Sequence, residues 1–240
     1  MSVSLRCYST SLGCPKNRVD TERLLGSLGV ALVPVESPDE AELVFINTCA
    51  FIQPATEESV RTIAQAIADI EELPKRPLLA VAGCLVGRYH AEDLAPELPE
   101  VDLWLDNSDL EAWPAMLARK LGLPEPTVPG RILSTGPSYA WLKISDGCRH
   151  ACSFCAIPNI RGGHRSHCKD MIVREARALL DQGVKELNLV AQDLTEWGCD
   201  LDGKQDLRTL LDGLLPLQGL ERLRLMYLYP AGMTHEMLKY

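Results

Sequence analysis

Short apolar runs alternate with amphipathic stretches along most of this chain. Runs of about five apolar residues predict strands, and stretches with apolar residues at helical spacing predict helices. Strands that alternate with helices form a mostly parallel sheet covered on both faces, so we expect an α/β domain over residues 1–123. Its predicted strands are 5–9, 30–35, 43–46, 78–82 and 101–105, and its predicted helices are 19–28, 55–73, 92–98 and 110–121.

Prolines and glycines gather between residues 122 and 138, which marks a boundary between domains. We place a linker at 124–137 and a second domain at 138–240. Three strand–helix units fit there, whereas a complete eight-fold barrel needs about 250 residues, so we expect a shortened barrel with an open sheet edge. Its predicted strands are 139–145, 187–190 and 223–228, and its predicted helices are 172–182 and 207–215.

The net charge of −9 lies entirely in residues 1–137, which hold 11 basic and 20 acidic residues. An acidic surface repels phosphate backbones and attracts basic partners, so direct nucleic-acid binding is not expected. The longest apolar runs are about half of the roughly 20 residues that a membrane span needs, and residues 1–6 lack the pattern of a secretory signal. We therefore expect a cytoplasmic protein with no membrane partner.

The nine cysteines favour metal or redox chemistry, because cytosolic thiols are kept reduced. Cys148, Cys152 and Cys155 form a C-x₃-C-x₂-C run directly after a predicted strand. Iron–sulfur clusters usually have four thiolate ligands, so three local thiolates leave one iron open to another ligand. A structural zinc site and a chance cluster of buried cysteines are the alternatives. The further residues that keep the zinc alternative open are His150, His164, His167 and Cys168.

Cys14, Cys49 and Cys84 are 35 residues apart, which is about the length of a βαβ unit, and each follows a predicted strand. The carboxyl ends of neighbouring parallel strands converge on one crevice, so three thiols could meet there without a fourth. The alternative is three unrelated buried cysteines. Gly13 and Gly83 favour the common site, because each puts a permissive backbone beside a thiol. The remaining cysteines, which we interpret as structural or incidental, are Cys7, Cys168 and Cys199.

Several motifs resemble one enzyme family. The 148–155 run, with Phe154 before its last cysteine, resembles the signature of radical S-adenosylmethionine enzymes. SLGCPKNRVDTE at 11–22, NTCAFI at 47–52 and AGCL at 82–85 resemble the amino-terminal domain of the methylthiotransferases. Within that family, CPKN at 14–17, AQDLT at 191–195 and LYP at 228–230 resemble the RimO branch, which modifies a ribosomal protein.

The resemblance implies an open parallel-sheet methylthiotransferase domain followed by the first half of a radical S-adenosylmethionine partial (β/α) barrel. It implies two 4Fe-4S clusters and S-adenosyl-L-methionine as cofactors. Cys148, Cys152 and Cys155 would hold the cluster whose open iron binds S-adenosylmethionine. Cys14, Cys49 and Cys84 would hold an auxiliary cluster that carries the sulfur to be inserted, and we expect the two sites to face a common cavity. The residues expected to contact the cofactor are Phe154, Gln192 and Asp193, and the alternative for Gln192 and Asp193 is a plain strand-to-loop cap.

The 161–166 run resembles a family loop, in which Arg161 and Arg165 would either meet a carboxylate or form a solvated basic loop. The chain departs from the family at His167 and Cys168, where Arg-Pro is expected. Relatives of this kind continue through the rest of a six-unit barrel and a TRAM domain, which this sequence lacks. We therefore expect a chain that ligates clusters but has weak turnover or none by itself.

The resemblance implies an enzyme that adds a methylthio group to the β-carbon of an aspartate of a small-subunit ribosomal protein. That C–H bond is too weakly acidic for a side-chain base, so a radical derived from the cofactor is required. The expected partners are the basic ribosomal protein and an electron donor such as flavodoxin or ferredoxin. Two alternatives stay open, namely a methylthiotransferase acting on transfer RNA and a non-catalytic iron–sulfur or zinc module.

Overall fold

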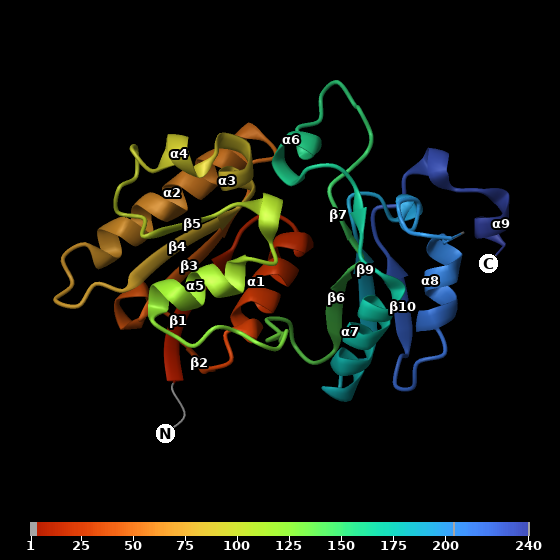
Figure 1. Cartoon of the computed structure of the whole chain (residues 1–240), viewed down its shortest axis with the longest axis horizontal. Helices are drawn as coiled ribbons and strands as arrows, with labels where there is room; N and C mark the ends of the chain where they lie inside the picture. Colours follow the sequence, from red (N-terminus) through yellow and green to blue (C-terminus); the bar gives the residue numbers. More distant parts are fainter. Residues whose placement is uncertain (1–3, 204, 240) are drawn as a thin grey trace. The chain divides into compact units, whose positions relative to one another are not determined.

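A computed structural model describes residues 4–203 and 205–239 of the chain (Figure 1). It contains two compact units, Met1–Ile132 and Leu133–Tyr240. Residues 1–3, which belong to the segment in which we expect no secretory signal, lie outside the described residues. Among the described helices, none is long and apolar enough to cross a membrane.

The first unit is built on one five-stranded sheet with the order β2-β1-β3-β4-β5, in which every pair is parallel. This arrangement confirms the predicted open parallel sheet. Ser11 at the end of β1 pairs with Asn47, and Thr48 at the end of β3 pairs with Gly83, so the carboxyl ends of β1, β3 and β4 are neighbours. The strands are β1 (Ser4–Ser11), β2 (Ala31–Pro34), β3 (Leu43–Thr48), β4 (Leu78–Gly83) and β5 (Leu103–Leu105).

Helices cover the first sheet because successive strand residues point to opposite faces and both sets are apolar. Phe45 belongs to a core shared with Leu24 of α1 and Trp113 of α5. Ile46, on the opposite face of β3, lines a hollow with Ala66 of α2. The helices are α1 (Pro15–Ser27), η1 (Pro38–Glu40), α2 (Gln53–Ile70), α3 (Cys84–Tyr89), α4 (Ala91–Leu94), η2 (Asn107–Asp109) and α5 (Trp113–Leu121).

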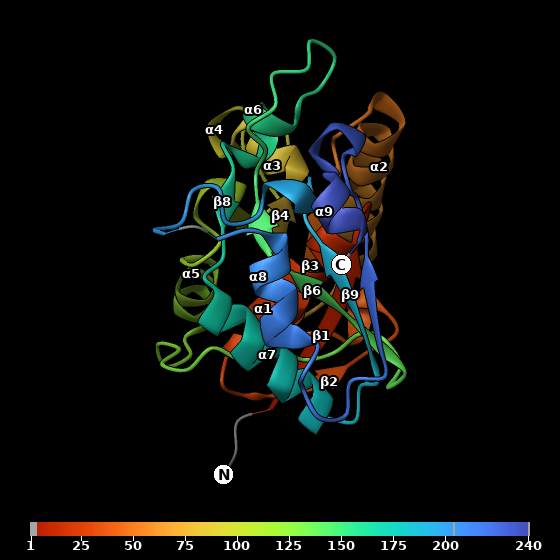
Figure 2. The same cartoon turned by 90° about the vertical axis from the view of Figure 1, so that its right-hand side faces the viewer.

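The second unit contains a parallel three-stranded sheet with the order β10-β9-β6 and a separate antiparallel pair, β7 with β8. Helix α7 packs on β6 and against α8, as Figure 2 shows. The strands are β6 (Tyr139–Lys143), β7 (Ser145–Asp146), β8 (Arg165–Ser166), β9 (Glu186–Val190) and β10 (Arg222–Leu225). The helices are α6 (Ile157–Arg161), α7 (Lys169–Asp181), η3 (Leu194–Glu196), α8 (Leu207–Leu214), η4 (Pro230–Gly232) and α9 (His235–Leu238).

The structure corrects several predicted boundaries. The predicted strand 223–228 ends at Leu225, and Tyr227 adopts a φ of 69°, which an extended strand cannot contain. The predicted helix 92–98 is the single turn Ala91–Leu94. Helix α3 was missed, because its apolar residues continue the apolar run of β4 without a break in the pattern.

Candidate metal centres

The first cysteine triplet follows the three neighbouring strands β1, β3 and β4 (Figure 1). Cys14 is the residue before α1, Cys49 comes directly after β3, and Cys84 opens α3. A hydrogen bond with the Cys84 thiol, together with burial and the nearby Cys14, raises the pKa of Cys49. The structure therefore brings these three thiols together, although they lie far apart in the sequence.

Two glycines make room for this arrangement. Gly13 has a φ of 80°, and a Cβ atom there would lie 2.6 Å from the Cβ and 2.7 Å from the Sγ of Cys49. Gly83 has a φ of 99°, and a Cβ atom there would overlap the side chain of Asn47 and lie 2.6 Å from the carbonyl oxygen of Thr48. Both positions combine a left-handed backbone with a close approach, so only glycine fits without a shift.

A buried amide pair connects α1 with the loop after β1 and with the end of β3. The Asn17 side chain donates hydrogen bonds to the carbonyl oxygens of Leu12 (2.9 Å) and Thr48 (2.8 Å), and its Oδ1 lies 3.7 Å from the Sγ of Cys84. The Asn47 side chain donates to the Asn17 carbonyl oxygen at 2.9 Å. Sequence reasoning missed the role of Asn17, and its place in the CPKN motif three residues after Cys14 was the available signal.

Cys49 is also held from helix α2. The Ser59 hydroxyl accepts a hydrogen bond from the Cys49 backbone N–H at 3.0 Å and donates one to the Cys49 carbonyl oxygen at 2.7 Å. Ser59 is fully buried, so its hydroxyl fixes the Cys49 peptide from the covering helix. No pattern in the sequence indicated this contact.

The second triplet lies in the loop between β7 and α6. Cys148, Cys152 and Cys155 are half-buried free thiols. The Cys148 N–H donates to the Gly162 carbonyl oxygen at 3.2 Å, and the His150 N–H donates to the Cys148 Sγ at 3.4 Å. Burial, together with the charges of Cys155 and Cys152, raises the pKa of Cys148. These contacts show that the loop folds back on itself, with Cys152 and Cys155 near enough to Cys148 to influence its charge.

The cysteine loop is connected to the end of β9 through Asp193. One carboxylate oxygen of this buried residue lies 2.9 Å from the His150 Nε2. The other oxygen accepts hydrogen bonds from the Thr195 N–H and hydroxyl and from the Tyr229 N–H. Burial acts to raise the pKa of Asp193, but these hydrogen bonds outweigh it, so the net shift is downward. Asp193 therefore caps η3 and orients the His150 side chain.

The other two residues predicted to contact a cofactor have different surroundings. Gln192 is half-buried beside Asp193 at the end of β9. Phe154 is 88% exposed in the cysteine loop. An aromatic side chain this exposed makes little contact with the core, so it is available to a ligand.

A buried charge cluster anchors both ends of the cysteine loop. The Asp146 carboxylate, just before the loop, lies 3.0 Å from the Lys143 Nζ, 3.1 Å from an Arg161 guanidinium nitrogen and 3.2 Å from the His167 Nε2. Burial opposes ionisation, but the charges of Lys143 and Arg161 and the hydrogen bond with His167 hold the pKa of Asp146 well below its usual value. Arg161 therefore meets a carboxylate within its own unit, whereas Arg165 is exposed.

The remaining cysteines differ in their surroundings. Cys7 is buried in β1, and burial raises its pKa to about 12. Cys168 is exposed at the start of α7. Cys199 is exposed in the loop after η3, beside His164 and Asp200.

Residues 6–106 match the family described as uncharacterized protein family UPF0004. Proteins called ribosomal protein uS12 methylthiotransferase RimO from Nitratidesulfovibrio vulgaris (strain DP4), Lawsonia intracellularis and Aquifex aeolicus are 69%, 59% and 47% identical to this chain. The alignments cover 96%, 100% and 96% of this chain, and 54%, 54% and 51% of those proteins. The chain thus spans about half the length of the curated relatives it matches.

Two solved structures show the same fold at low sequence identity. The radical S-adenosylmethionine methyltransferase TsrM from Kitasatospora setae is 13% identical, with a TM-score of 0.65 over 100% of this chain and 56% of that chain. The cobalamin-dependent radical enzyme OxsB is 14% identical, with a TM-score of 0.53 over 92% of this chain and 38% of that chain.

The predicted fold class is therefore confirmed, with an open parallel sheet followed by a parallel sheet that partly matches radical S-adenosylmethionine enzymes. The motifs that resembled the RimO branch lie within the alignments to the uS12 enzymes. The chain is a homologue of the RimO ribosomal protein uS12 methylthiotransferases, over the half of their length that it spans.

Proposed function

We propose that this chain forms the cluster-binding part of a radical S-adenosylmethionine enzyme that adds a methylthio group to the β-carbon of an aspartate of ribosomal protein uS12. One observation carries the proposal. Two triplets of free thiols stand in a chain that is 69% identical over 231 residues to a protein called uS12 methylthiotransferase. The first triplet follows strand ends of a parallel sheet, where α/β enzymes place their ligands, and the second lies in the loop after β7.

The donor chemistry of both triplets fits iron–sulfur clusters. Such clusters are held by cysteine thiolates, and each triplet supplies three free thiols, with the fourth iron position left for another ligand. Both Cys49 and Cys148, whose pKa values are raised in the metal-free chain, must lose their protons when metal binds. Cluster assembly should therefore be favoured as the pH rises, because ligation requires the thiolate.

In this proposal Cys14, Cys49 and Cys84 hold one 4Fe-4S cluster and Cys148, Cys152 and Cys155 hold the other. Bound clusters and S-adenosylmethionine would supply the electron, the radical and the sulfur that no side chain can provide.

The chain itself positions these groups. The Asp193–His150 contact fixes the second cysteine loop against β9. We propose that Gln192 and Phe154 contact the cofactor directly. Phe154 is an exposed residue of the cysteine loop, and Gln192 lies just after β9, against which that loop is fixed. The Asp193 carboxylate already accepts hydrogen bonds from Thr195 and Tyr229, so its contribution to cofactor binding is mainly to hold the end of β9 in place.

The charge distribution suits a basic protein substrate. Residues 1–137 carry all of the net negative charge, and ribosomal proteins that contact RNA are typically basic, so long-range attraction favours their approach. An electron donor such as flavodoxin or ferredoxin completes the proposed set of partners. Direct binding to nucleic acid is not part of the proposal.

The first test is anaerobic reconstitution of the full chain with iron and sulfide. Two clusters correspond to about eight iron atoms per chain. Cys14→Ala and Cys148→Ala should each remove about half of the iron, and Cys168→Ala is the matched control that should remove none. Circular dichroism confirms that each variant is folded. A folded variant that keeps all of its iron would refute the assigned ligand set, and zinc without iron would favour the structural-module alternative.

The second test distinguishes the reaction from simple cluster binding. S-adenosylmethionine should change the electron paramagnetic resonance spectrum of the reduced wild type and of Cys14→Ala, but not that of Cys148→Ala. Mass spectrometry then follows methylthio transfer to uS12 and, separately, to transfer RNA, in the presence of a reductant. Because we expect weak turnover or none from this chain by itself, the same assay is run with a full-length relative as the positive control. A modified transfer RNA beside unmodified uS12 would assign the chain to the other branch of the family.

A further inference from the structure

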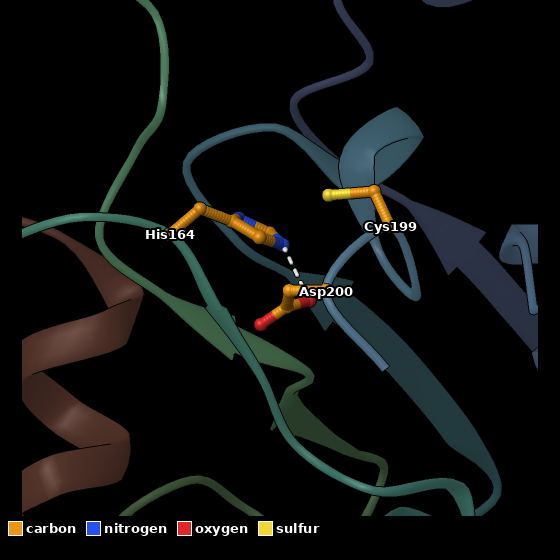
Figure 3. Close-up of side chains that lie close together, drawn as sticks. All are labelled: His164, Cys199 and Asp200. Carbon is orange, nitrogen blue, oxygen red and sulfur yellow. Dashed lines mark ion pairs between the residues drawn. The ribbon is translucent and has the colours of Figure 1, made fainter. Parts of the chain in front are cut away.

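Three side chains with different donor atoms come together in the second unit, apart from the two cysteine triplets. His164, Cys199 and Asp200 each offer one ligand atom, and these atoms lie within 4.8 Å of one another (Figure 3). His164 comes from the segment between α6 and β8, whereas Cys199 and Asp200 come from the loop that follows η3.

Hydrogen bonds between backbone N–H groups and side chains hold the two segments together. The Ser166 N–H donates to the Asp200 carboxylate at 2.9 Å, and the Ser166 hydroxyl accepts from the Gly198 N–H at 2.9 Å. Gly198 has a φ of 90°, and a Cβ atom there would lie 2.7 Å from the carbonyl oxygen of Gln205. This tight turn presents Cys199 and Asp200 toward His164 before any ligand is added.

The geometry around the imidazole does not fit a nucleophilic triad. The Nε2 of His164 lies 3.5 Å from the Asp200 Oδ1 and 3.0 Å from the Ser166 hydroxyl, and the imidazole side chain is only 4% exposed. In a nucleophilic triad the two ring nitrogens serve different partners, one the nucleophile and one the carboxylate. Here the Asp200 carboxylate and the Ser166 hydroxyl approach the same ring nitrogen, so the three side chains do not form a triad, and a cation would replace these contacts at Nε2.

We propose that His164, Cys199 and Asp200 form a site for a zinc-class divalent cation, with water as the fourth ligand. Zinc accepts nitrogen, sulfur and oxygen donors at about 2.0–2.3 Å in a tetrahedral arrangement, which places neighbouring donors about 3.3–3.8 Å apart. The 3.5 Å separation between His164 and Asp200 already lies in that range. The exposed Cys199 thiol completes the set by a side-chain rotation.

The charges around the cluster have both signs. The Asp200 carboxylate accepts the Ser166 N–H, and Arg149, which pairs with Glu196 at 2.7 Å, lies near Cys199. Ligation requires the thiolate form of Cys199, so a bound cation would displace one proton.

An ion here would act as a clamp on the second cysteine loop. His164 follows Gly162 and Gly163, and the Cys148 N–H donates to the Gly162 carbonyl oxygen. A Cβ atom on Gly147 would collide with the Gly163 carbonyl oxygen, so the loop start packs tightly on this segment. Joining His164 to the loop after η3 would hold that packing in place.

The test is residue-resolved alkylation of the full, reduced, EDTA-treated chain by iodoacetamide, with and without zinc chloride. Zinc should slow the alkylation of Cys199 at least tenfold and leave that of Cys168, the exposed control in the same unit, unchanged. Mass spectrometry reads each cysteine separately, so zinc taken up by either triplet does not obscure the result. An unchanged Cys199 rate, or equal slowing of Cys168, would overturn the proposal.

Two variants identify the other ligands. His164→Gln and Asp200→Asn should each abolish the protection of Cys199 by zinc, while the Cys168 rate reports that α7 is still folded. Full protection of Cys199 in either variant would remove that residue from the site. The measurement uses no iron, so its failure would leave the iron contents expected for the two triplets unaffected.

Discussion

The two cysteine triplets are built in opposite ways. Cys14, Cys49 and Cys84 come from three strand ends of one sheet, and their neighbours Asn17 and Asn47 are fully buried. The second triplet occupies one loop of eight residues, 148–155, with half-buried thiols. The first geometry is thus a property of the whole sheet, whereas the second depends on how one loop is anchored.

This difference predicts separable failures. A change that disturbs the sheet ends should affect the first triplet and leave the second intact. A change at the anchors of the loop should do the reverse. Iron content and thiol reactivity, measured for each triplet, report the two outcomes independently.

The largest effect is expected from Asp146→Asn. It removes the carboxylate that faces Lys143, Arg161 and His167 in a buried cluster, and loss of one partner of a buried pair costs about 3–5 kcal/mol. Chemical denaturation of the cluster-free chain measures the loss in the second unit. Glu221→Gln, which breaks the exposed pair with Lys185, is the control with little expected change. Equal iron loss from both triplets would contradict the separation.

Gly83→Ala tests the first triplet, which depends on the strand ends of the sheet. The backbone at Gly83 is in a region that only glycine populates, and a Cβ atom would overlap Asn47, so we expect a cost of about 2–4 kcal/mol. Gly122→Ala is a matched control in the same unit, with a φ of 69° and no atom within 4 Å of the added carbon, and should cost about 1–2 kcal/mol. Thermal unfolding compares them, and equal losses would show that the overlap relaxes freely.

The sequence predicted the sheet well, because period and length decide strands such as β3 and β4. It also singled out the cysteines of both triplets through their spacing. The features that the sequence did not predict depend on contacts between distant segments, and no spacing of residue types in the sequence links those segments. The Asp146 cluster depends on the pairing of β7 with β8, which brings 143–146 beside 165–167. This pairing covers only two residues of each strand. A ladder this short leaves no periodic signal.

The supporting residues of the first triplet escaped prediction for a related reason. Asn17 and Ser59 act through side-chain hydrogen bonds to backbone groups 31 and 10 residues away. Which peptide such a side chain meets depends on how a helix is rotated against the sheet, and that is decided by packing. Similarly, Cys199 looked incidental until the turn at Gly198 placed it beside His164.

A smaller effect is expected from Ser59→Ala. It removes two hydrogen bonds to the Cys49 peptide inside the protein, which costs about 1–2 kcal/mol. Thr62→Ala on the same helix removes an exposed hydroxyl that bonds to the Glu58 carbonyl oxygen, and should change stability by about 0.5 kcal/mol or less. Urea denaturation compares the pair. A larger loss for Thr62→Ala would refute the role given to Ser59.

The smallest effect concerns Asp206, which lies outside both triplets and caps helix α8 through the Thr209 N–H. Burial acts to raise the pKa of Asp206, but hydrogen bonds from Thr209 and Arg208 outweigh it, so the folded pKa lies below the unfolded value of about 3.9. The charged cap therefore stabilises the fold above about pH 4, and this contribution is lost as the pH falls through the folded pKa.

Asp206→Asn keeps an equally good capping side chain but removes the titration. The free energy of unfolding of the wild type should exceed that of the variant by less than about 1 kcal/mol at pH 6 and low salt, and the difference should shrink as the pH falls below about 4. Iron bound at both triplets should not change. Because neither triplet contacts this cap, a variant that lost iron from either would show that the loop and the sheet are less independent than their construction implies.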